Sequence, residues 1–215
     1  GCSAAALTDG MVALAEDYGV DVINMSIGSA PQLNDGMNAR ALLYNRLIDE
    51  TGVQIFISAG NSGAGSNTVG DPSVASDVVS VGASVSKETW WANYGSATEQ
   101  KRDIMPFSAR GPREDGGFKP DLTAPGSAVS AVPDWLEGGA PAETGYSLPV
   151  GTAMFNGTSM AAPQATGAAA LLLSAAKQNG IDLSARELRN ALYTSASFTQ
   201  DVVAAAQGRG QLDVP

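Results

Sequence analysis

The sequence has no histidine and one cysteine, Cys2, among its 215 residues. A single cysteine excludes a disulfide within the chain. The absence of histidine removes the side chain that most often serves as general base in catalysis and as metal ligand. Neither role can therefore be filled by an imidazole from these residues.

Positive charge and long apolar runs are also scarce. The sequence has 12 Lys and Arg against 22 Asp and Glu, a formal net charge of -10. An acidic chain binds a phosphate backbone poorly, so we expect no nucleic-acid partner. No run approaches the ~18 consecutive apolar residues of a membrane span, and no signal peptide is visible, so we expect no membrane partner. The length fits one domain over residues 1–215.

Apolar residues alternate along the chain between helical spacing and short β-branched runs. We expect helices over residues 7–15, 37–48, 158–176 and 183–193, and strands over residues 20–25, 53–57, 78–85 and 122–124. This order is typical of an α/β protein in which helices cover a parallel sheet. The polar stretches 89–118 and 133–152 are expected to be long surface loops.

Two segments rich in Gly and Ser, residues 26–29 and 58–63, follow predicted buried strands. Parallel sheets bind ligands at the carboxyl ends of their strands. The first segment offers an edge that can pair with an extended peptide. The second presents Asn61, whose amide can donate a hydrogen bond to an oxyanion. Taken alone, each segment is equally consistent with an ordinary strand-to-turn transition.

Residues 156–163 read Asn-Gly-Thr-Ser-Met-Ala-Ala-Pro and lead from a polar stretch into an apolar helix. Thr158 or Ser159 then lies at the helix N-terminus, where free N–H groups and the dipole favour negative charge. A serine there can be a nucleophile whose own N–H serves the developing oxyanion. Pro163 is expected in the first helical turn. Taken alone, the segment is more simply a capped helix start.

Two further motifs are, taken alone, structural turns. They are Phe-Ser-Ala-Arg-Gly-Pro at residues 107–112 and Lys-Pro-Asp-Leu-Thr-Ala-Pro-Gly at residues 119–126, in which Arg110 and Asp121 can pair. Asp71 and Asp77 are expected to be solvated turn acids. No acidic cluster has the ligand spacing of a calcium site.

Taken together, these segments resemble the subtilisin-like serine peptidases (subtilases, peptidase family S8) in content and in order, over nearly the whole chain. A finer resemblance, to the tripeptidyl-peptidase II-like branch, rests on residues 68–72, 127–135, Asn156 and 206–210. The resemblance implies a three-layer α/β/α subtilisin-like fold with a mostly parallel sheet. It also implies hydrolysis of peptide or protein substrates through an acyl-enzyme.

The resemblance assigns roles residue by residue. Ser159 corresponds to the acylating nucleophile, and Asn61 to the side-chain oxyanion donor that acts beside the Ser159 N–H. The substrate-binding positions are an edge that holds the peptide backbone, Ser26, Ile27 and Gly28, and a far wall of the primary specificity pocket, Ser58, Ala59 and Gly60. No cofactor is implied; subtilases often hold calcium, for which this sequence identifies no site.

The family's triad histidine and aspartate lie in segments before the matched region, and no aspartate here lies in the family's aspartate motif. We therefore expect residues 1–215 to be the C-terminal part of a catalytic domain, inactive alone; the lack of a methionine at position 1 agrees. The missing N-terminal part would be its partner. Without it the sheet would be incomplete and its open edge prone to self-association.

Two other functions remain open on this evidence. One is a catalytically dead peptide-binding module, although binding alone would not require both Ser159 and Asn61. The other is a structural or assembly module. We expect an extracellular location, with a cytoplasmic one open for a parent like tripeptidyl-peptidase II.

Overall fold

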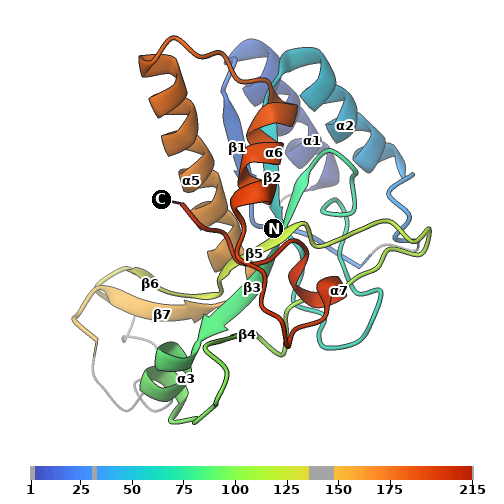
Figure 1. The fold of residues 1–215 in the computed structure, drawn as a ribbon. Helices are drawn as coiled ribbons and strands as arrows, with labels where there is room; N and C mark the ends of the chain where they lie inside the picture. Colours follow the sequence, from blue (N-terminus) through green and yellow to red (C-terminus); the bar gives the residue numbers. More distant parts are fainter. Residues whose placement is uncertain (1–2, 31–32, 136–147, 215) are drawn as a thin grey trace.

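The computed structural model describes residues 3–30, 33–135 and 148–214 (Figure 1). In chain order its helices and strands are α1 (Ala4–Val12), η1 (Ala13–Asp17, a π-helical turn that continues α1), β1 (Val22–Met25), α2 (Ala39–Thr51), β2 (Gln54–Ser58), β3 (Val79–Ser86), α3 (Lys87–Tyr94), β4 (Arg102–Ile104), β5 (Leu122–Pro125), β6 (Ser127–Ala131), β7 (Thr152–Asn156), α5 (Thr158–Gln178), α6 (Ala185–Ser195) and α7 (Ala204–Gln207).

The main sheet is mostly parallel, as the sequence predicts. β1, β2 and β3 pair in parallel in that order, and β5 pairs in parallel with β3. β4 pairs antiparallel with the end of β3. Among the described strands β1 has one neighbour, β2, so β1 forms an edge of the sheet.

Helices cover both faces of this sheet, which confirms the α/β class with three layers (Figure 1). Along β2, Ile55 and Ile57 pack on the face of α1 and α2, while Phe56 between them packs on the face of α5 and α6. This alternation follows from the two-residue period of a strand. All five β2 residues are buried, as expected for a strand inside a parallel sheet.

Helix α5 is long and rich in alanine, so it packs closely against β1, β2 and β3. Pro163 is its sixth residue, so the placement of this proline in the first turn is wrong. Proline has no N–H to donate to the carbonyl four residues earlier, which is that of Ser159. The Ser26 hydroxyl donates to this Ser159 carbonyl instead, at 3.0 Å.

The Lys-Pro-Asp motif forms a buried charge cluster. Asp121 accepts hydrogen bonds from the Ser80 N–H at 2.8 Å and the Lys119 ammonium at 2.7 Å. Arg209 also pairs with Asp121, at 3.3 Å, whereas the expected pair with Arg110 is not formed. Burial lowers the pKa of Lys119, and the adjacent carboxylate of Asp121 opposes this shift. The cluster ties the start of β5 to β3.

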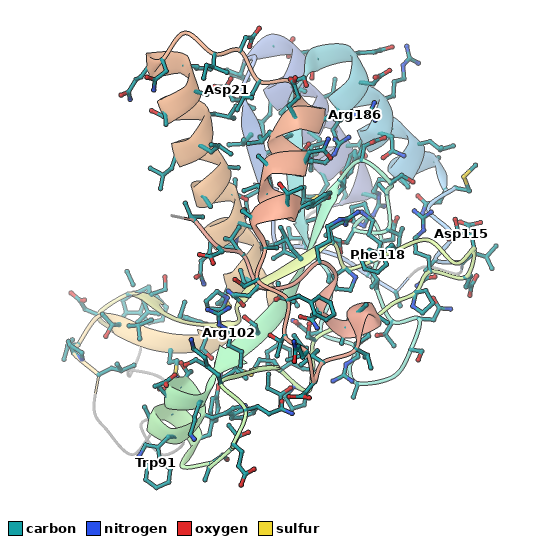
Figure 2. All side chains as sticks on the ribbon, viewed as in Figure 1. Asp21, Trp91, Arg102, Asp115, Phe118 and Arg186 are labelled. Carbon is teal, nitrogen blue, oxygen red and sulfur yellow. The ribbon has the colours of Figure 1, made fainter. Side chains whose placement is uncertain are left out.

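The expectation of an unbroken loop over residues 89–118 is wrong, because that stretch contains most of α3 and all of β4. In the second stretch, residues 133–135 and 148–151 lie outside helices and strands as expected, and residue 152 begins β7, which pairs antiparallel with β6 in a hairpin. Residues 136–147 of the second stretch lie outside the described residues. α3 is short and has no clear apolar stripe, since Trp91 is 67% exposed and points away from the body of the protein (Figure 2). Periodicity therefore could not reveal it.

Within the described ranges, no helix combines the length and apolar character required to cross a bilayer.

Candidate active site

Asn61 and Thr158 lie against each other where the loop after β2 meets the start of α5. The Asn61 side-chain carbonyl accepts two hydrogen bonds from Thr158, one from its N–H at 2.9 Å and one from its hydroxyl at 2.8 Å. The Thr158 hydroxyl in turn accepts from the Gly60 N–H at 3.2 Å. This clamp fixes the orientation of the Asn61 amide, because Oδ1 is held towards the helix and Nδ2 must point the other way.

The Nδ2 atom of Asn61 and the backbone nitrogen of Ser159 border one small space beside Gly157. A Cβ built on Gly157 would lie 3.4 Å from Asn61 Nδ2 and 3.6 Å from Ser159 N. Glycine leaves this space open. The Ser159 N–H belongs to the first turn of α5, where it has no acceptor within the helix. Two donors therefore converge where a developing negative charge can be stabilised.

The predicted nucleophile contacts the predicted peptide-binding edge. The Ser159 hydroxyl donates to the Ser26 carbonyl at 3.3 Å, alongside the bond from Ser26 to the Ser159 carbonyl. Ile27 is exposed. Gly28 lies close to another chain segment, since a Cβ there would be 3.1 Å from the Asp71 carbonyl. The structure thus brings Ser26 to Ser159 and leads residues 27 and 28 away over the surface.

The predicted pocket wall is built mainly from backbone. The Ala59 carbonyl accepts from the Gly70 N–H at 2.8 Å, and the Gly60 carbonyl accepts from the Ala109 N–H at 2.9 Å. Ser58 and Ala59 are buried, so of the three residues Gly60 is the one partly open to solvent. Gly60 has φ 113°, a conformation that favours glycine.

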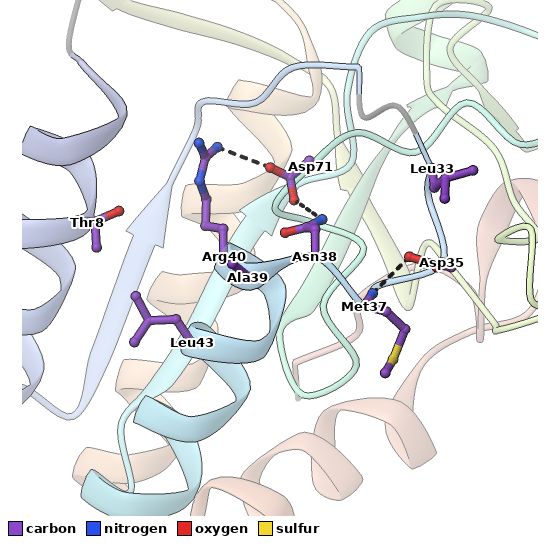
Figure 3. A pocket seen from close by; sticks show the side chains of 9 residues that line it. All are labelled: Thr8, Leu33, Asp35, Met37, Asn38, Ala39, Arg40, Leu43 and Asp71. Atoms are coloured by element: carbon purple, nitrogen blue, oxygen red, sulfur yellow. Dashed lines mark hydrogen bonds and ion pairs between the residues drawn. The ribbon is translucent and has the colours of Figure 1, made fainter.

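The expectation that Asp71 is a solvated turn acid is wrong. Asp71 is 8% exposed, and its carboxylate accepts hydrogen bonds from Asn38 at 2.8 Å and Arg40 at 3.1 Å (Figure 3). These residues border a cavity of about 700 Å³ whose other lining residues are Thr8, Leu33, Asp35, Met37, Ala39 and Leu43. Asp77 is half-exposed and pairs with Arg189 at 2.9 Å. Both acids therefore have structural partners.

A second hydrogen-bonded cluster, missed by the sequence analysis, adjoins the site. The Asn156 side-chain carbonyl accepts from the Tyr94 hydroxyl at 2.6 Å and the Ser127 hydroxyl at 2.7 Å. Tyr94 ends α3, which was expected to be loop. A signal was present in the sequence: Ser86 and Gly95 bracket eight residues as helix caps.

Within the described residues, no three or more Cys, Asp or Glu side chains gather as a metal-ligand set.

The sequence model of the subtilase family matches residues 1–210. Pyrolysin from Pyrococcus furiosus is 34% identical over 93% of the chain, and tripeptidyl-peptidase 2 from Caenorhabditis elegans is 33% identical over 94%. The chain spans 14% of the length of each of these two proteins. Serine protease AprX from Bacillus subtilis is 31% identical over 86% of the chain, which spans 40% of that protein.

Solved structures of proteases are also similar to this chain. The chain matches a lanthipeptide protease with a TM-score of 0.73 and 26% identity, over 99% of this chain and 64% of that one. The prenylagaramide maturation protease PagA matches with a TM-score of 0.67 and 25% identity, over 100% of this chain and 66% of that one. The predicted resemblance to subtilases, with tripeptidyl-peptidase II among the relatives, is confirmed.

Proposed function

Since the chain belongs to the subtilase family, we propose that it carries the nucleophile and the oxyanion-binding half of a serine peptidase active site. The observation that carries this proposal is the clamp on Asn61. Thr158 holds the amide so that its Nδ2 faces the space beside Gly157 that the Ser159 N–H also borders.

In the proposed reaction, the Ser159 oxygen attacks the scissile carbonyl and its proton passes to a general base. The carbonyl oxygen becomes an oxyanion in the space beside Gly157, where Asn61 Nδ2 and the Ser159 N–H donate to it. Collapse of this intermediate expels the amine and leaves an acyl group on Ser159. Water then releases the acyl group through a second oxyanion. No step is assigned to a metal or cofactor.

The substrate side of the proposal uses the backbone segments that meet Ser159. Ser26, Ile27 and Gly28 form the edge along which an extended peptide pairs, since Ser26 already contacts Ser159. Gly60 presents the open part of the specificity-pocket wall, and Ser58 and Ala59 support it from behind. The substrates are therefore peptides or unfolded protein segments.

We propose that the general base, a histidine in the triad that the family resemblance implies, comes from outside residues 1–215, because the sequence has no histidine, and that the carboxylate that orients it comes from outside as well. We accordingly propose that the chain alone is inactive and works with a preceding part of the same catalytic domain. The open edge of β1 offers a place for that part, and self-association there is the outcome expected in its absence. An extracellular location is proposed; one relative bears the name extracellular basic protease.

A fluorophosphonate probe tests this proposal, because it labels a serine only when that serine is activated. We expect labelling of the intact polypeptide at Ser159, and none after Ser159→Ala or in residues 1–215 alone. Ser174→Ala, an exposed serine of the same helix, is the matched control and should be labelled normally. An unlabelled intact polypeptide would contradict the peptidase function and favour a peptide-binding module. Labelling of residues 1–215 alone would contradict the external base.

The role of Asn61 is tested by Asn61→Ala in the intact polypeptide. We expect kcat to fall by about 10²–10³-fold, the loss that removal of an oxyanion donor causes in the relative subtilisin, with KM little changed. Asn190→Ala is the control, because Asn190 is exposed on α6 and its side chain bonds to none of the described residues. Equal kcat in Asn61→Ala and wild type would contradict the oxyanion role.

A further inference from the structure

Asn156 precedes Gly157, the residue that leaves the oxyanion space open. Its side chain is exposed, yet its carbonyl oxygen accepts two short hydrogen bonds, from Tyr94 and from Ser127. A carbonyl oxygen has two lone pairs, so these two donors saturate it. The orientation of the Asn156 side chain is therefore set from two directions.

Tyr94 is a firm anchor because its ring packs on the core. Its ring meets that of Trp90 edge-on, with 5.1 Å between centroids. Together with Phe107, these two rings pack on a buried cluster formed by Ala83, Val85 and Met105. Helix α3, which carries Trp90 and Tyr94, is capped by the Ser86 hydroxyl at its start and by Gly95, with φ 62°, at its end.

The segment that leads to Asn156 has little core of its own. β6 and β7 form a separate two-stranded hairpin that projects from the body of the protein beside α3 (Figure 1). Its apolar side chains Val129 and Phe155 are 52% and 39% exposed. Two-stranded hairpins are marginally stable by themselves. Hydrogen bonds at the base of the hairpin, rather than buried apolar area, must therefore hold its end in place.

Four contacts lie at that base. Ser127 is opposite Asn156 in the hairpin register, and the Gly157 N–H donates to the Gly126 carbonyl at 2.9 Å. From α3, the Tyr94 hydroxyl reaches Asn156 and also lies 3.3 Å from the Ser127 hydroxyl. A shift of Asn156 would move Gly157, which borders both oxyanion donors, since the two residues share a peptide bond.

We propose that Tyr94 is a positioning residue that holds Asn156, and through it the Gly157 backbone, in the place that keeps the two oxyanion donors correctly spaced. This inference rests on the proposed function for its catalytic consequence. It adds α3, a helix from a distant part of the chain, to the elements that position the proposed nucleophile motif.

The test is Tyr94→Phe in the intact polypeptide, which keeps the ring packing and removes only the hydroxyl. We expect kcat to fall about fivefold, the scale of one neutral hydrogen bond, with KM unchanged. We also expect backbone amides of residues 156–159 to exchange with deuterium about fivefold faster. Tyr18→Phe is the matched control, since Tyr18 is 76% exposed and its side chain bonds to none of the described residues.

A double-mutant cycle shows whether Tyr94 acts through Asn156. Asn156→Ala should itself lower kcat, and adding Tyr94→Phe in that background should change kcat and the exchange rates less than it does in the wild type, because only the 3.3 Å contact between the Tyr94 and Ser127 hydroxyls then remains. An equal effect of Tyr94→Phe in both backgrounds would overturn the proposal. So would unchanged kcat and exchange in Tyr94→Phe alone.

The proposed function and this inference fail in different ways. If the wild-type polypeptide does not react with a fluorophosphonate, the peptidase function is wrong, and the hydrogen-exchange comparison still decides whether Tyr94 orders residues 156–159. If the wild type reacts and Tyr94→Phe reacts at the same rate with the same exchange, only the positioning role is wrong.

Discussion

The two neighbours of Gly157 are held by hydrogen bonds of similar length in opposite environments. Thr158 is 1% exposed and bonds to Asn61 and Gly60, both in the loop after β2. Asn156 is exposed and bonds to Tyr94 and Ser127. The difference teaches that one short segment can combine a buried support, which water cannot replace, with an exposed support, for which water competes.

The two supports should therefore respond differently to the same kind of change. Removing a hydrogen-bond partner from the buried support leaves a polar group unsatisfied, which lowers both the free energy of unfolding and kcat. Removing one from the exposed side costs little stability, because water takes the vacant place. Two substitutions test this contrast, and a third tests the space beside Gly157 that lies between the two supports.

The largest effect is expected from Gly157→Ala, at the junction of the two supports. Gly157 has φ 160° and ψ 161°, an extended conformation open to alanine, and the new methyl group would meet its neighbours at ordinary contact distance. The methyl group would, however, fill the space that we propose for the oxyanion. We expect kcat to fall by about 10²–10³-fold, as for loss of a donor, with little change in melting temperature.

Gly167→Ala is the control for this substitution. Gly167 lies in α5, and a Cβ there would meet nothing within 4 Å. We expect full activity and a small gain in stability of about 1 kcal/mol, because alanine favours the helix. Normal kcat in Gly157→Ala would show that the space beside Gly157 is not the oxyanion site.

An intermediate effect is expected from Thr158→Val, which breaks the buried support. Valine keeps the shape of threonine but removes the hydroxyl that accepts from Gly60 and donates to Asn61. The free energy of unfolding should fall by about 1–3 kcal/mol, the cost of an unsatisfied buried group. Denaturant titration measures this, and kcat should fall less than in Gly157→Ala. Thr158→Ser, which keeps the hydroxyl, should preserve most of the free energy of unfolding and most of kcat. Equal losses in Thr158→Ser and Thr158→Val would contradict the role of the hydroxyl.

The smallest effect is expected from Ser127→Ala, which removes one donor of the exposed support. Tyr94 still holds the Asn156 carbonyl, and water can take the place of the serine hydroxyl. The unfolding free energy should change by no more than about 0.5 kcal/mol, as for most surface substitutions. A loss as large as that in Thr158→Val would mean that the two supports do not differ in the way their burial indicates.

The part of the site built on the main sheet was open to prediction from the sequence. The strand before Asn61 is a run of buried β-branched and aromatic residues, and the start of α5 is marked by a polar run before an alanine-rich helix. Such local patterns place residues at the carboxyl ends of parallel strands. Asn61 and Ser159 accordingly lie together, as the order of motifs predicts.

The part of the site built on the hairpin could not be predicted from the sequence. The pattern of residues 87–94 carries no apolar period, and no local rule says that its last tyrosine reaches a residue 62 positions later. The burial of Asp71 was missed for the same reason, because its partners Asn38 and Arg40 lie on another element. Polar contacts between distant segments produce no periodic pattern in the sequence.

The amino-acid pattern alone was sufficient for the α/β class and the parallel sheet, because both depend on periodicity, and the order of contiguous motifs was sufficient for the resemblance to subtilases. Only the folded chain decided that Thr158 orients the Asn61 amide, that the Ser26 hydroxyl serves a carbonyl left free by Pro163, and that Tyr94 holds Asn156. These are hydrogen bonds between residues far apart in sequence. Their geometry depends on how whole strands and helices pack, which no local rule of sequence contains.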